Sequence, residues 1–177
     1  MGNFFNNGIR ENIEYMNPKP NSKPGDFDYY MLAFSNAQEY CKEHGYPNTL
    51  QCKGKNSQGQ PFNWVLHGLW PQFRNRGNDS YPEFCQDTFN PSDDDLFQTL
   101  EQIGHELGIV WTDIAPEYGT KDDQGTYMVR HEWTKHGSCT GLSPYEYFRL
   151  AFSQSLKYID NKSTSICLDK EMNIIDC

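Results

Sequence analysis

The sequence has no long apolar run. No segment approaches the roughly 20 consecutive apolar residues of a membrane-spanning helix, which predicts a protein without a membrane span. Positive charge is also scarce, since 15 Lys and Arg stand against 24 Asp and Glu, for a formal net charge of −9. Proteins that coat DNA depend on a broad cationic surface. The composition therefore argues against that class, but it leaves room for a nucleic-acid enzyme whose cations are confined to one site.

The sequence also lacks internal repeats and any segment with the composition of an interdomain linker. Its 177 residues are enough for one domain with a hydrophobic core. The chain contains 11 Tyr, 11 Phe and 4 Trp, more aromatic residues than a disordered chain carries. We therefore expect a single folded domain, preceded by an irregular arm over residues 1–25 that is rich in Asn, Pro and Gly.

Six cysteines are present, and no two of them have the Cys-x-x-Cys spacing of a zinc knuckle or a redox site. They are Cys41, Cys52, Cys85, Cys139, Cys167 and Cys177. An even number predicts a disulfide framework, whose connectivity the spacing leaves open. Disulfides imply an oxidising compartment, and two glycosylation sequons, at Asn78 and Asn161, agree with it. The alternative is a cytosolic protein with six buried free thiols.

Strands are expected in the first half of the chain and at its end. Residues 27–35 (FDYYMLAFS) are apolar on both faces, which is typical of a central strand. Further strands are expected at 62–67, 164–168 and 172–175. We expect His67 to end its strand at Gly68, because the segment from there to residue 90 has the Pro, Gly and Arg content of a long loop.

Two helices have signals for both their starts and their buried faces. Ser92 is an N-cap before three aspartates, and Ser143 begins a capping box that places Pro144 in the first turn. The predicted buried residues are Leu96, Leu100, Ile103 and Leu107 in the first helix and Phe148, Ala151, Phe152 and Leu156 in the second. A short helix is expected at 37–44, a polar loop at 113–125 and a helical turn at 127–136. These elements predict one α+β domain.

A first histidine motif spans residues 64–71 (WVLHGLWP). His67 would lie where the strand meets the loop, and Trp70 just beyond it would be exposed enough to stack on a flat ligand. The alternative is that His67 is a core histidine and Trp70 a packing residue. This motif alone does not decide between the two interpretations.

A second motif spans residues 131–139 (HEWTKHGSC). At about 100° per residue, one helix face carries its ionisable side chains and the opposite face carries Trp133 and Thr134. The ionisable residues are His131, Glu132, Lys135 and His136. Four such groups on one face favour acid–base chemistry over stability. The alternative is a solvated face with ordinary ion pairs.

The second motif does not fit a zinc protease. The protease pattern His-Glu-x-x-His needs its second imidazole four residues after the first. Here that position is Lys135, a cation that cannot bind zinc at neutral pH, and His136 comes one residue late.

Together the two motifs resemble the active-site segments of the ribonuclease T2 family. The likeness extends to residues 27–35 followed by Cys41, and to Ser80-Tyr81-Pro82 with Cys85, so it covers about residues 27–152 in consistent order. The pair His-Gly-Leu-Trp-Pro and His-Glu-Trp-x-Lys-His-Gly-x-Cys is a specific double signature.

The resemblance implies a metal-free α+β endoribonuclease that cleaves single-stranded RNA. In this reaction the ribose 2′-hydroxyl attacks the adjacent phosphorus, giving a 2′,3′-cyclic phosphate that is slowly hydrolysed to a 3′-phosphate. Position by position, the resemblance makes His136 the general base and His67 the general acid. It assigns stabilisation of the charged phosphorane to Lys135 and Glu132, phosphate binding to His131 and base stacking to Trp70 and Tyr81.

The resemblance also implies further contacts. Gln72 takes a substrate-binding position where many relatives carry Asp. The disulfides that it implies are Cys41–Cys52, Cys85–Cys139 and Cys167–Cys177. We ourselves expect Arg74, Arg76 and Arg130 to supply cations around the site beside Lys135. We thus expect a disulfide-stapled α+β domain with a central antiparallel sheet flanked by helices, its catalytic part over residues 26–177.

Such a protein would act as a monomer on RNA without a cofactor, away from membranes, and would be secreted or lysosomal/vacuolar. Two alternatives stay open. A catalytically silent relative serving as a storage or binding protein is expected to have lost a catalytic histidine, and both are present. A disulfide-stapled carbohydrate or peptide binder would leave the histidine pair unexplained.

Overall fold

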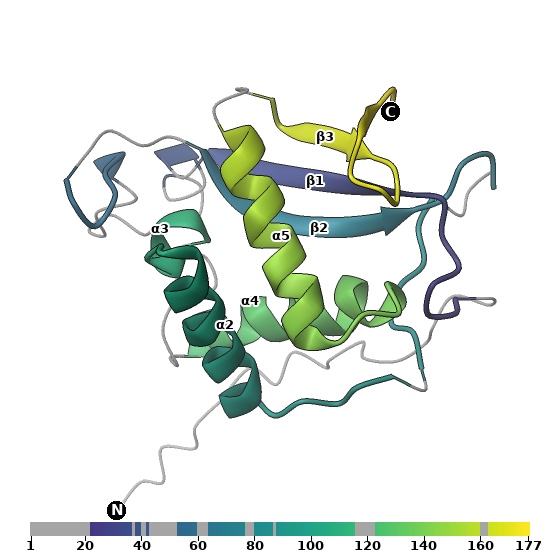
Figure 1. The fold of residues 1–177 in the computed structure, drawn as a ribbon, viewed down its shortest axis with the longest axis horizontal. Helices are drawn as coiled ribbons and strands as arrows, with labels where there is room; N and C mark the ends of the chain where they lie inside the picture. Colours follow the sequence, from purple (N-terminus) through teal and green to yellow (C-terminus); the bar gives the residue numbers. More distant parts are fainter. Residues whose placement is uncertain are drawn as a thin grey trace, which may run out of the picture.

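The computed structural model describes residues 22–36, 38–39, 42, 53–59, 64–76, 80–86, 88–115, 123–159 and 163–177. Its centre is a four-stranded sheet in the order β2-β1-β3-β4, with every pairing antiparallel (Figure 1). The strands are β1 (Tyr29–Asn36), β2 (Trp64–Gln72), β3 (Ser165–Leu168) and β4 (Ile174–Ile175). The predicted α+β class with an antiparallel sheet is confirmed.

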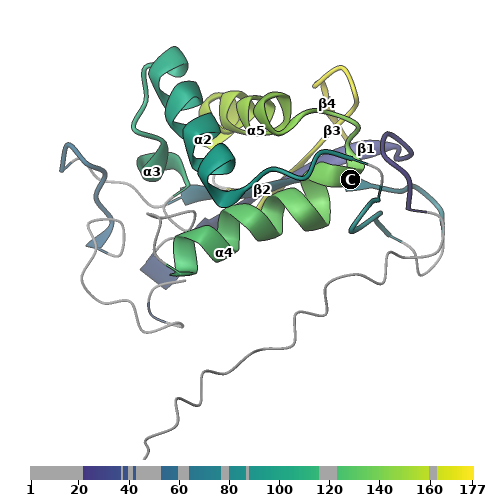
Figure 2. The ribbon, with the colours of Figure 1, turned by 90° about the horizontal axis from the view of Figure 1, so that it is seen from below.

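The helices pack on one face of this sheet and along its β2 edge. Helices α2 (Asp93–Leu107) and α5 (Pro144–Tyr158) lie side by side above the sheet, and α4 (Asp123–His131) runs beside β2 (Figures 1 and 2). The core between these elements contains side chains with no exposed surface: Leu32, Leu66, Leu69, Leu96, Leu100, Ile103, Phe148 and Phe152. The second histidine motif thus lies directly next to the strand that carries the first.

Both long helices begin where the sequence predicts. Ser92 caps α2 and Ser143 caps α5, each in a reciprocal capping box with the residue three positions later. One predicted core residue of α5 is wrong, because Leu156 is 43% exposed. The buried stripe instead includes Tyr147 and Tyr158, which shifts its centre around the helix and leaves Leu156 at its edge.

Strand β2 is longer than predicted. It continues through Gly68 to Gln72, so the expected end of the strand at His67 is wrong. Gly68 signals a turn in the sequence, yet here it permits close packing, since a Cβ at this position would collide with Glu132 and Trp70. Pro71 is tolerated because β2 is an edge strand.

The other predicted elements agree in part. The predicted polar loop 113–125 is helical at both of its described ends. Its first residues belong to a short helix, α3 (Trp111–Ile114), where Ile114 and the following Ala115 are buried in the core, and its last residues begin α4. Gln38, Glu39 and Lys42 are helical, and the rest of the expected helix at 37–44 lies outside the described residues. So do most of the expected arm over residues 1–25, Cys41, Cys52, Asn78 and Asn161.

Candidate active site

His67 stands at a β-bulge. Ala33 pairs with Gly68 and Phe34 with Leu66, so His67 is the extra residue on β2. A bulge redirects a side chain out of the regular alternation of a strand. The His67 imidazole reaches Ser35 on β1 with its Nδ1, 3.0 Å from Oγ, and approaches Glu132 with its Nε2, 3.7 Å from Oε1.

The second motif forms a π-helical turn, η3 (Glu132–His136), followed by a 3-10 turn, η4 (Gly137–Cys139). Hydrogen bonding from residue i to i+5 widens the turn and brings residues five apart to the same side. His131 and His136 are five apart, and their ring centroids lie 6.1 Å from each other. The motif's Gly137 is required here, because a Cβ would lie 2.6 Å from the Trp133 ring.

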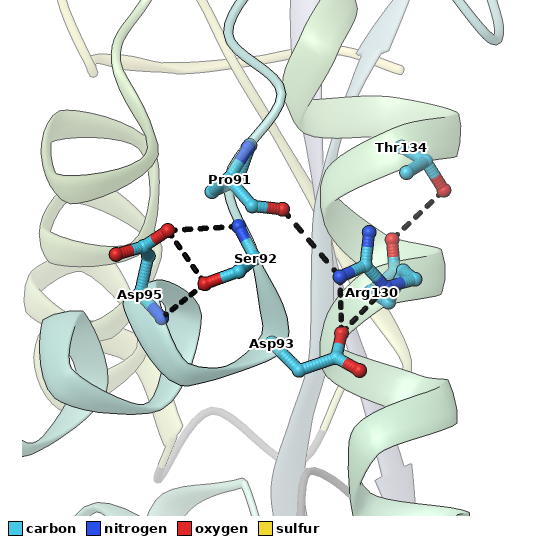
Figure 3. A network of polar contacts seen from close by, with 6 residues as sticks. All are labelled: Pro91, Ser92, Asp93, Asp95, Arg130 and Thr134. Carbon is cyan, nitrogen blue, oxygen red and sulfur yellow. Dashed lines mark hydrogen bonds and ion pairs between the residues drawn. The ribbon is translucent and has the colours of Figure 1, made fainter.

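An ion pair joins α4 to α2. The Arg130 guanidinium binds the Asp93 carboxylate and the Pro91 carbonyl next to the capping box of α2 (Figure 3). The Thr134 hydroxyl donates to the Arg130 carbonyl at 2.8 Å, where the π-helical turn begins (Figure 3). Trp133, on the opposite side from the ionisable residues, is buried in the core.

Trp70 connects the two motifs. Its Nε1 donates to Oε2 of the buried Glu132 at 2.9 Å. Its ring stacks on His136, with centroids 5.1 Å apart and planes at 27°, and meets His67 edge-on at 5.3 Å. The two imidazoles predicted to move protons therefore pack against one indole. That contact orients both rings, and the base-stacking role that the resemblance implies for Trp70 stays a prediction.

The segment 80–86 closes the site from the side of Lys135. Tyr81 lies 6.1 Å from His136, and the Lys135 Nζ is 5.8 Å from the Tyr81 ring centroid. The Glu83 carboxylate is 3.9 Å from the same Nζ. A backbone hydrogen bond from Phe84 to Lys135 and the disulfide Cys85–Cys139 hold the segment there.

Other predicted site residues are placed differently. Gln72 is buried at the end of β2, 6% exposed. We expected Arg76 and Arg130 to supply cations to the histidine cluster. Instead, Arg76 forms an ion pair with Asp26, and Arg130 forms one with Asp93. The Arg74 guanidinium donates to the Asp176 carbonyl. Lys135 is the predicted cation that the structure brings to the cluster.

Burial and nearby positive charge govern the protonation of the imidazoles. Burial lowers the pKa of His67 to about 4, and the positive charges of His131 and Lys135 add to the effect. Burial also lowers the pKa of His131, again helped by Lys135. In the protein without substrate, both rings therefore favour the neutral form near pH 7. A bound phosphate would oppose this shift, since a nearby negative charge stabilises imidazolium.

His131, Glu132 and His136 also have the composition of a metal site. One ligand atom of each lies within 4.8 Å of the others. This arrangement differs from the His-Glu-x-x-His pattern of zinc proteases, because the π-helical turn brings together histidines that are five residues apart. However, Oε2 of Glu132 is bound by Trp70, and the Lys135 ammonium on the same turn would repel a cation. We therefore assign no metal to the cluster.

Sequence reasoning missed two residues of the site, Ser35 and Glu83. Ser35 belongs to a predicted strand and Glu83 to a predicted loop, and neither is part of a histidine motif. Both reach the site through contacts between distant segments, with His67 and Lys135 respectively. A single sequence has no local signal for contacts of this kind.

Comparison with known proteins gives a consistent result. The family model described as Ribonuclease T2 family matches residues 27–177. A ribonuclease of Aeromonas hydrophila is 30% identical over 127 residues, which are 72% of this chain and 44% of that protein. Ribonuclease DdI of Dictyostelium discoideum is 27% identical over 151 residues, 85% of this chain and 56% of that protein. The chain thus spans about half the length of these relatives.

The fold is shared with solved structures as well. The structure of trichomaglin, described as a novel S-like ribonuclease, superposes with a TM-score of 0.53 at 16% identity, covering 86% of this chain and 92% of that one. At this identity the likeness concerns the fold. The match of the family model over residues 27–177 shows that the chain belongs to the ribonuclease T2 family.

Proposed function

We propose that the protein is a metal-independent endoribonuclease that cleaves single-stranded RNA through a 2′,3′-cyclic phosphate. One observation carries the proposal: His67 of β2 and His136 of η3 both pack against the ring of Trp70, whose Nε1 binds the Glu132 carboxylate beside His67. Two imidazoles from separate segments, set around one position, are what a reaction with two proton transfers requires.

The reaction assigns one proton transfer to each ring. Neutral His136 takes the proton of the ribose 2′-hydroxyl while the 2′-oxygen attacks phosphorus. Protonated His67 gives its Nε2 proton to the departing 5′-oxygen. In the hydrolysis of the cyclic phosphate, the roles reverse with water as the nucleophile, which leads to a 3′-phosphate.

The remaining residues stabilise charge and hold the substrate. The Lys135 ammonium is the cation for the phosphorane, and its 3.9 Å contact with Glu83 is weak enough to yield to a phosphate. Glu132 sits beside Nε2 of His67, where a carboxylate stabilises the imidazolium. His131, on the same turn, binds the phosphate, and Tyr81 offers a ring for base stacking.

The site of action that we propose is extracytoplasmic, either secreted or lysosomal/vacuolar. Its support is the pair of disulfides, Cys85–Cys139 and Cys167–Cys177, in the described part of the chain. Within that same part, no helix combines the length and the hydropathy needed to cross a membrane. We propose a monomer, because the site is assembled from segments of one chain.

The proposal is tested by digestion of single-stranded RNA across the pH range. We expect a bell-shaped profile with an acidic to neutral optimum, because His136 must be neutral and His67 protonated. The lowered pKa of His67 places the falling limb of kcat/KM at acidic pH, since the free enzyme loses this proton as pH rises. The falling limb of kcat should lie at higher pH, because the bound phosphate raises the pKa of His67.

Two results would contradict this scheme. A rate that still rises above about pH 8.5 would exclude a protonated histidine as the acid. Absence of cleavage at both pH 5 and pH 7 in folded protein would favour the catalytically silent relative.

A further inference from the structure

A serine outside both motifs contacts one of the proposed catalytic rings. Ser35 Oγ lies 3.0 Å from Nδ1 of His67, although the two residues are 32 positions apart. The pairing of β1 with β2 brings them together, because Ser35 pairs with Val65, two residues before the bulge. The same bulge turns the His67 ring towards Ser35 and the site.

The two nitrogens of this ring therefore have different surroundings. Nδ1 faces Ser35 on β1, and Nε2 faces Glu132 on η3 at 3.7 Å. The positive charges of His131 and Lys135 also act on the ring. Since Nδ1 is hydrogen-bonded to Ser35, Nε2 is the nitrogen that can exchange a proton with a substrate.

A hydroxyl suits this position because it can both donate and accept. When His67 is protonated, its Nδ1–H donates to Ser35 Oγ. When Nε2–H gives its proton to the departing 5′-oxygen, that N–H bond breaks, and the neutral ring keeps its remaining proton on Nδ1, still bound to the same oxygen. The contact thus holds through the whole step without rotation of the ring.

We propose that Ser35 is a positioning residue that fixes His67 with Nε2 towards the substrate and stabilises its protonated form. The inference rests on the proposed role of His67 as general acid. It predicts that loss of the hydroxyl lowers the pKa of His67, because the charged ring then loses the oxygen that accepts from its Nδ1–H. Burial already lowers this pKa to about 4, so the acid is sensitive to the loss of a stabilising contact.

The test compares Ser35→Val with Ser35→Thr. Valine and threonine have nearly the same shape, and both suit a strand. They differ only in that valine has a methyl where threonine has the hydroxyl. Ser165→Val is the matched control, since Ser165 lies on β3 and pairs with Ala33 on the opposite side of β1 from β2. For each variant we would measure kcat, KM, the pH profile and the NMR titration of His67 without RNA.

We expect Ser35→Val to lower kcat about tenfold, as for loss of a hydrogen bond to a charged group, with KM changed less than about twofold. Its His67 pKa and the falling limb of the pH profile should both move to lower pH. Ser35→Thr and Ser165→Val should stay within about twofold of the original protein. If Ser35→Val does not fold, the smaller Ser35→Ala replaces it.

The proposal is overturned if Ser35→Val leaves kcat and the His67 titration unchanged, or if Ser35→Thr is impaired as strongly. The NMR titration needs no catalysis, so it separates this inference from the proposed function. A shifted His67 titration with unchanged cleavage would mean that Ser35 binds His67 but that His67 is not the general acid. This result would reject both the positioning role of Ser35 and the acid role of His67.

Discussion

His67→Ala and His136→Ala should each lower the rate of RNA cleavage by about a hundredfold to ten-thousandfold, the range for loss of a general acid or base. Each variant removes one of the two proton transfers and leaves the other ring in place. The double variant should lose much less than the product of the two single losses, because the rings act in one step. Steady-state kinetics on a defined RNA oligonucleotide would measure all three.

The control for these variants is His105→Ala. His105 is exposed in the last turn of α2, away from the histidine cluster. Its variant should cleave RNA at the original rate, and thermal unfolding should show that all four variants are folded. Near-normal activity of folded His67→Ala or His136→Ala would refute the assigned roles.

Loss of the Cys85–Cys139 disulfide should inactivate the protein far more than loss of Cys167–Cys177. The first bond ties segment 80–86, with Tyr81 and Glu83, to η4 directly after the π-helical turn η3. It closes a sequence separation of 54 residues, for which the entropic model gives about 4 kcal/mol. The second closes only 10 residues at the chain end, for which the same model gives less than about 3 kcal/mol.

The measurement compares two double variants, Cys85→Ala/Cys139→Ala and Cys167→Ala/Cys177→Ala. We expect the first to lose most of its kcat/KM and to have the lower Tm, and the second to keep most of its activity. Equal activity of the two folded variants would mean that the bond next to the site is not needed to hold segment 80–86 in place.

Local patterns in the sequence predicted much of the fold. The capping residues Ser92 and Ser143 located the starts of α2 and α5, because an N-cap depends on neighbours within one turn. The spacing of apolar residues located most of the buried residues of α2 and α5. It failed at Leu156, where the direction of the buried stripe is set by packing against β2 and α2 rather than by the helix itself.

The motifs identified the ionisable residues of the site but not its geometry. The bulge at His67 depends on the register between β1 and β2, and the π-helical turn depends on the packing of Trp133 and Gly137 against Tyr147. Both features depend on contacts with residues outside the histidine motifs. The contact with Ser35 follows from the same register, and so no local pattern could predict it.

Product analysis of a defined oligonucleotide tests the central claim most directly. The substrate is a DNA strand with four separated ribonucleotides, one of each base, digested with and without excess EDTA and analysed by mass. We predict cleavage only after ribonucleotides, with 2′,3′-cyclic phosphate and 3′-phosphate ends, unchanged by EDTA, because the nucleophile is the 2′-hydroxyl and the proton carriers are His67 and His136. EDTA-sensitive cleavage at deoxynucleotides that leaves 5′-phosphates would instead show metal-activated water and would contradict the account.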